Sequence, residues 1–84
     1  GKEQDVKMLV ENHLAGVMID RFGKDIMMVP VDKEHFSVKV QVHVSRQFLG
    51  WVISLGEGIK IIGPDEVVGQ MKQEIKRLVE QYGE

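Results

Sequence analysis

The sequence has no cysteine, only two prolines, and few aromatic residues, which make up 6% of its 84 residues. The absence of cysteine excludes disulfide bonds, thiolate zinc sites and catalysis by a thiol nucleophile. No apolar run approaches the roughly 18 residues that span a bilayer, and no signal-peptide pattern is present. We therefore expect a cytoplasmic protein that does not contact a membrane.

The sequence also lacks a large excess of charge of either sign. Lys and Arg number 11 and Asp and Glu number 13, so the net charge is −2. Nucleic-acid-binding domains usually carry a basic excess. We therefore expect no direct nucleic-acid binding by this chain.

The hydrophobic fraction of 43% and the charged fraction of 29% are typical of a folded domain rather than a disordered chain. A chain of this length forms one domain, which we expect over residues 5–84. We expect residues 1–4 to be a disordered start or a cloning remnant.

Hydrophobic periodicity predicts an alternation of strands and helices. In chain order it predicts a strand over 5–11, a helix over 13–22, an edge strand over 26–31, a strand over 36–44, a helix over 46–55, a strand over 58–62 and a helix from Pro64 to about Gln81.

The segment Phe36–Val44 gives the clearest strand pattern, because its apolar residues alternate strictly with polar ones. We expect Phe36, Val38, Val40, Val42 and Val44 to face two helices. Pro30 places its own strand at a sheet edge, since proline cannot donate to a sheet ladder. Two β–α–β units with right-handed connections predict an α+β, ferredoxin-like βαββαβ fold, an antiparallel four-stranded sheet of order 4-1-3-2 with an added C-terminal helix.

Residue types at the predicted helix ends match capping preferences. Asn12 and Ser45 are suited to cap the first and second helices. Gly23 and Gly56 are suited to end them, because glycine tolerates the left-handed conformation. Pro64 is expected at the first position of the third helix.

No residue pattern in the chain indicates a catalytic, cofactor-binding or metal-binding site. His13, His35 and His43 lack the i, i+4 helical spacing that chelates zinc, so we interpret them as surface histidines. Gly56-Glu57-Gly58 precedes a strand rather than a helix, which does not suit a phosphate loop.

Trp51 is interpreted as a core residue, with Gly50 allowing its helix to approach a neighbour closely. The alternative is that Trp51 anchors a protein–protein contact, where tryptophan is enriched. The charged residues of the first and third helices are expected to be solvated; they are Asp20, Arg21, Glu74, Lys76, Arg77 and Glu80.

Four segments together resemble a known family: Ile19–Asp25, Gln47–Trp51, Ser54–Gly56 and Ile61–Pro64. They resemble the C-terminal extension of WYL-type bacterial transcriptional regulators, often called the WCX domain. The residues that carry this motif are Phe22, Gly23, Phe48, Gly50, Trp51, Gly56 and Pro64.

The resemblance implies a non-catalytic regulatory domain that supports dimerisation and couples effector sensing in a WYL domain to a DNA-binding domain. The chain has no Trp-Tyr-Leu triplet and no helix-turn-helix pattern, so we expect an excised C-terminal piece. Its expected partners are a second copy, the WYL domain of the same regulator, or both.

Other functions of the expected fold remain as alternatives. The main one is a small-molecule sensor with a ferredoxin-like fold, although no polar cluster converges on a pocket in the sequence. An acylphosphatase-like enzyme would need an arginine in the loop after the first strand, where this chain has Glu11-Asn12-His13.

Apolar residues that the first two helices do not cover predict an interface. The strand over 26–31 is apolar on both faces, and Leu9 and Ile62 point to the open face of the sheet. Unless the third helix folds back, this surface exceeds what a monomer usually exposes. The candidate interface residues are Leu9, Met27, Val29, Ile62 and Met71.

Overall fold

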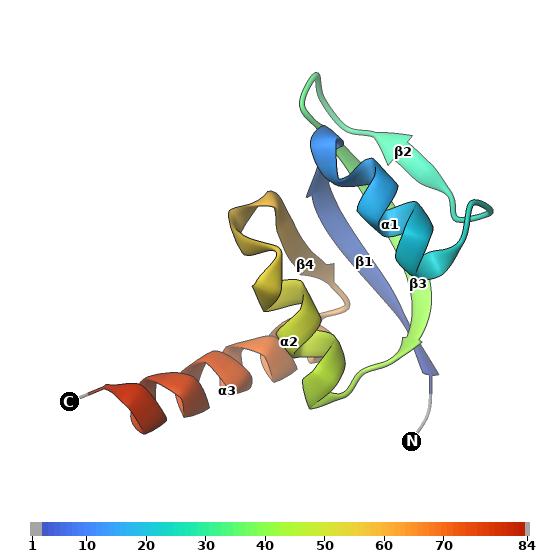
Figure 1. The fold of residues 1–84 in the computed structure, drawn as a ribbon. Helices are drawn as coiled ribbons and strands as arrows, with labels where there is room; N and C mark the ends of the chain where they lie inside the picture. The colour runs from blue at the N-terminus through green and yellow to red at the C-terminus, as the bar shows by residue number, and fades with distance from the viewer. Residues whose placement is uncertain (1–2, 84) are drawn as a thin grey trace.

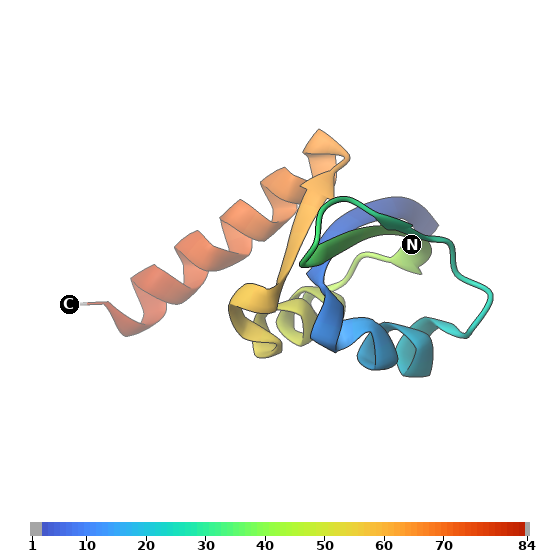
Figure 2. The same cartoon turned by 90° about the horizontal axis from the view of Figure 1, so that it is seen from above.

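In the computed structural model, which describes residues 3–83, two helices cover one face of an antiparallel sheet and a third extends from its edge (Figures 1 and 2). The elements are β1 (Glu3–Glu11), η1 (Asn12–Leu14, a 3-10 turn), α1 (Ala15–Phe22), β2 (Met28–Pro30), β3 (His35–His43), α2 (Arg46–Ser54), η2 (Gly56–Gly58, a 3-10 turn), β4 (Ile59–Gly63) and α3 (Asp65–Tyr82).

The four strands form one sheet in the order β2-β3-β1-β4, with every neighbouring pair antiparallel. Counted from the β4 edge, the same sheet reads 4-1-3-2. β1 pairs with β3 along its whole length, with Val6 opposite Val40. β2, which contains Pro30, lies at one edge of the sheet as expected from the missing proline N–H.

The core lies between the sheet and helices α1 and α2. Phe36, Val38 and Val40 of β3 are buried, and Lys39 and Gln41 are exposed, as the alternation predicts. The alternation is wrong for Ser37, which is buried with 8% exposure. The other buried apolar residues come from β1, both covering helices, β4 and the start of α3; they are Val6, Met8, Val10, Met18, Phe48, Leu49, Val52, Ile59, Ile61 and Val67.

The end of β3 departs from the expected pattern. Val42 is only half-buried, and Val44 lies beyond the strand, which ends at His43. Glu3 pairs with His43 at this end of the sheet, so residues 3–4 belong to β1 and their expected disorder is wrong. Residues 1–2 of that predicted start lie outside the described residues.

The first helix starts later than predicted because Asn12 does not cap it. The Asn12 amide donates instead to the Lys33 carbonyl at 2.9 Å, and its backbone N–H donates to the Glu34 carbonyl at 2.8 Å. These bonds tie the β2–β3 turn to the end of β1. The chain then passes through a 3-10 turn before α1 begins at Ala15.

Other helix ends fall within one or two residues of the prediction. Ser45 caps α2, since its Oγ accepts a hydrogen bond from the Phe48 N–H at 3.1 Å. Gly56 follows α2 with φ of 72°, a conformation that glycine adopts without strain. Pro64 is the residue before α3 rather than its first helical residue.

Two strands are shorter or shifted for local reasons. β2 stops at Pro30 because the next residue, Val31, already donates to the His35 carbonyl to form the turn. β4 begins at Ile59 and not at Gly58, because the Gly56–Gly58 segment forms a 3-10 turn after α2.

Helix α3 starts beside β4 and runs away from the sheet, and both views show its far end without other elements around it (Figures 1 and 2). It does not fold back across the open face of the sheet. The sheet therefore keeps one face uncovered, and α3 adds a separate apolar surface.

Candidate interaction site

An apolar groove of about 460 Å³ lies between α3 on one side and α2 with β4 on the other. Its charged lining residues are Lys60 and Lys72. Its apolar lining residues are Val52, Ile53, Ile59, Ile61, Val68, Met71, Ile75 and Leu78.

The spacing of the apolar residues on α3 explains how this helix forms one wall of the groove. Intervals of three and four residues place them on one face of the helix, as in a helix–helix seam. This stripe, which we call the α3 seam, consists of Val68, Met71, Ile75, Leu78 and Tyr82.

Apolar residues are on the whole more exposed in the second half of α3 than in the first, although Leu78 is partly buried. Val67 in the first turn is fully buried, whereas Ile75 is 48% and Tyr82 is 78% exposed. Val79, beside the seam, is 62% exposed. The second half of α3 therefore presents large apolar side chains to solvent, which is unusual for a solvated helix.

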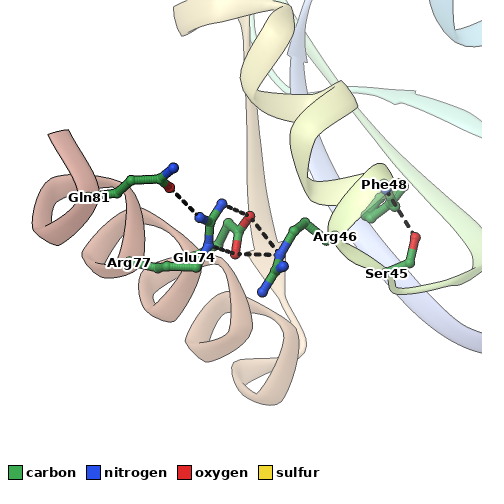
Figure 3. Close-up of polar contacts among 6 residues, drawn as sticks. All are labelled: Ser45, Arg46, Phe48, Glu74, Arg77 and Gln81. Carbon is green, nitrogen blue, oxygen red and sulfur yellow. Dashed lines mark hydrogen bonds and ion pairs between the residues drawn. The ribbon is translucent and has the colours of Figure 1, made fainter.

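A buried carboxylate holds α3 against α2 (Figure 3). Glu74 is only 8% exposed and lies between two arginines. The Nε of Arg46 donates to Glu74 Oε1 at 3.3 Å, and the Nη2 of Arg77 donates to Glu74 Oε2 at 2.9 Å. Arg77 in turn donates to Gln81 at 2.6 Å, so the network continues along α3.

The arginines also change the acidity of Glu74. The hydrogen bond from Arg77, together with the positive charges of Arg77 and Arg46, lowers the pKa of the Glu74 carboxyl below its ordinary value. Glu74 is thus held in its charged form, and the start of α2 and the middle of α3 are joined through it.

The expectation of a fully solvated charged face on α3 is wrong for Glu74, although Lys76 and Glu80 are exposed. Glu74 lies one heptad after the buried Val67, and residues seven apart share a side of a helix. That spacing is the signal in the sequence that places Glu74 toward the body of the domain.

The five candidate interface residues do not form one site. Leu9, Ser37 and Val29 are cross-strand neighbours on β1, β3 and β2. Their side chains therefore share the open face of the sheet. Ile62 follows the buried Ile61 and is 41% exposed. Met27 precedes β2 and is exposed, while Met71 lines the groove instead.

Trp51 is a half-buried residue that joins α1 to α2. Its ring makes an edge-to-face contact with Phe22 at 5.4 Å and stacks near Phe48 at 6.1 Å, both between ring centroids. The guanidinium of Arg21 lies 5.0 Å from the Trp51 ring centre, an interaction that the expectation of a solvated Arg21 missed. Trp51 therefore packs within its own domain.

Gly50 does not have the expected role. It is exposed, and a Cβ built on it would meet no atom within 4 Å. The interpretation that Gly50 lets α2 approach a neighbour is therefore wrong. Its small size is not required by packing within the described residues.

Two of the three histidines each pair with a carboxylate, and His43 is exposed on β3. His35 bonds to Asp32 at 2.8 Å within the β2–β3 turn, and His13 bonds to Glu11 at 2.8 Å. The hydrogen bond between His35 and Asp32 raises the pKa of His35 and lowers the pKa of Asp32. Within residues 3–83, no three His, Asp or Glu side chains gather in a way that could hold a metal ion.

The fold and the groove define a small α+β domain with exposed apolar surface. The family model of the WCX domain matches residues 2–79, so the chain belongs to the WCX domain family and the resemblance in the sequence is confirmed. This membership indicates a regulatory domain. A comparison with curated proteins finds no match. Across residues 3–83, no helix is long and apolar enough to cross a membrane.

Proposed function

We propose that this chain is the non-catalytic C-terminal regulatory and dimerisation domain of a WYL-type bacterial transcriptional regulator. It acts in the cytoplasm and couples effector sensing in the WYL domain to a DNA-binding domain. The observation that carries the proposal is the match to the WCX domain over residues 2–79. The antiparallel sheet with α1 and α2 on one face supports a ferredoxin-like assignment.

The geometry supports an assembly role in preference to a chemical one. Apolar surface is exposed in two places, the open sheet face and the α3 seam, and such surface favours contact with protein. The open face carries Lys7, Lys39 and Gln41 without the aromatic side chains that stack bases in RNA-binding domains of similar topology.

A small-molecule sensor is the second candidate, and the groove favours it. A volume of about 460 Å³ lies within the range of small-molecule sites. The two lysines at the groove would suit an apolar ligand with one anionic group. Octanoate should raise the melting temperature more than octanol if this candidate holds, and Lys72→Met should remove the difference.

The direct test of the proposed function begins with the sequence that adjoins this domain in its gene product. We expect a winged-helix segment and a WYL domain upstream. In that full protein, removing residues 5–82 should abolish the response of a reporter gene to effector, while the winged-helix domain produced alone still binds operator DNA. A catalytic domain upstream, or an unchanged reporter response, would refute the proposal.

A further inference from the structure

The molecule carries two surfaces that complement each other. One is the apolar groove between α3 and the α2–β4 pair, and the other is the exposed second half of α3. A groove and a projecting apolar helix on the same chain allow two copies to exchange the same contact about a two-fold axis.

We propose that the groove of one copy receives the second half of α3 from a second copy, with the two helices antiparallel and the contact reciprocal. This inference rests on the proposed function and deepens it, because it assigns the dimer contact to α3 rather than to the open sheet face. The occupant is thus a segment of the chain itself.

The α3 seam fits this arrangement in spacing. An antiparallel pair with its two-fold axis near Ile75 places Val68 opposite Tyr82 of the second copy and Met71 opposite Val79 of the second copy. The exposed apolar residues of the distal half, Ile75, Val79 and Tyr82, then meet groove residues of the other copy. Helix pairs of this kind bury residues at alternating three- and four-residue intervals, which is the spacing of the seam.

Charge at the groove also favours the C-terminal end of α3 as the occupant. The end of a helix carries partial negative charge on its free carbonyl groups. The last turn of α3 has no basic residue to offset that charge. In the antiparallel arrangement Lys72 of one copy lies near the last turns of the other α3, where its positive charge is favourable.

The Glu74 network prepares α3 for this contact. Arg46 and Arg77 hold Glu74 from both sides, so the helix is fixed relative to α2 before any partner binds. A helix that is already ordered loses less conformational entropy on binding than a free one. The groove and the projecting helix are therefore presented together.

Disulfide trapping tests the contact at single-residue resolution, because the chain has no cysteine of its own. We expect Ile75→Cys to form a disulfide-linked dimer under mild oxidation, since the two-fold axis passes near this residue. Val29→Cys, at a similarly exposed position on the open sheet face, is the control and should remain unlinked. Linkage through Val29 and not through Ile75 would overturn the inference.

Light scattering on the unmodified chain tests the same contact in solution. The dimer fraction should rise with concentration, and Val79→Lys should weaken dimerisation by roughly tenfold or more. Val29→Lys should leave it unchanged, and circular dichroism confirms that both variants fold. A strict monomer at every concentration would overturn the inference and the dimerisation part of the proposed function. It would leave the regulatory part standing, because that part is tested by the upstream domains and the reporter response. A dimer in a gene product with no winged-helix or WYL segment upstream would instead refute the proposed function and leave the inference standing.

Discussion

The Glu74 carboxylate on α3 accepts a hydrogen bond from the Arg46 guanidinium at the first residue of α2, at 3.3 Å. This is the polar link between the two helices, and Arg77 completes it from the other side. Apolar contact between α3 and the domain comes from the buried Val67 and from Val68 and Met71, which pack against the core. The angle of α3 is therefore set by one apolar contact and one ionic network.

Replacing the carboxylate should loosen α3. In Glu74→Gln the charge that attracts both arginines is lost, so we expect a broader distribution of α3 positions. Spin labels are attached to cysteines introduced at the exposed positions Asp5 and Lys76. Pulsed electron paramagnetic resonance then measures the distance between the two labels, with excess unlabelled chain present. Glu80→Gln, an exposed position on the same helix, is the matched control. Equal distributions in the two variants would show that the network does not hold the helix.

The same network predicts a dependence of stability on pH. The pKa of Glu74 is lowered in the folded state, so its stabilising effect is present above its unfolded pKa and is lost as pH falls through the folded value. The difference in urea midpoint between the unmodified chain and Glu74→Gln should therefore shrink from about pH 5 downward. A difference that stays constant down to about pH 2 would contradict this assignment.

The stability contributed by the β2–β3 turn should depend on pH with the opposite sign. The hydrogen bond to Asp32 raises the pKa of His35, so its stabilising effect is fully present below the unfolded pKa, about 6.5, and is lost as pH rises through the folded value. Urea midpoints of the unmodified chain and His35→Gln should converge at high pH. A difference in midpoint that stays constant as the pH rises would contradict this assignment.

The packing of Trp51 predicts a moderate loss of stability on truncation. Trp51→Ala removes the contacts with Phe22 and Phe48, but the side chain is half-buried, so we expect a cost of about 2–3 kcal/mol, at or below the low end for buried aromatic residues. Urea unfolding followed by circular dichroism measures it. Ile53→Ala, at an exposed position on the same helix, should cost less than about 1 kcal/mol. An unchanged midpoint in Trp51→Ala would instead favour the role of Trp51 as an anchor for a partner.

The strands were predictable because their pattern is local. The alternation over Phe36–Val44 follows directly from one buried and one wet face, and the buried apolar residues of β3 match it, whereas Ser37 is buried as well. Ser45 was predictable for a similar reason, because a cap bonds to the backbone three residues later.

The parts that could not be predicted depend on contacts between distant segments. Asn12 is used to fasten the β2–β3 turn, so its capping preference is overridden by a bond to Lys33. Nothing local to Glu74 marks Arg46 as its partner, although the heptad spacing from Val67 indicates the side on which it lies. The groove likewise depends on where α3 leaves β4, which no periodicity encodes.

The charge distribution leads to a final prediction about nucleic acid. The net charge is −2, and the groove offers only Lys60 and Lys72 as charged lining residues. Phosphate binding needs several clustered cations, because each neutralised phosphate contributes to affinity. We therefore expect the 84-residue chain to bind duplex or single-stranded DNA no better than an unrelated acidic protein of similar size. Fluorescence anisotropy with labelled oligonucleotides at physiological salt measures this. Sub-micromolar binding that Lys60→Gln and Lys72→Gln weaken would contradict it and would place a nucleic-acid contact in the groove.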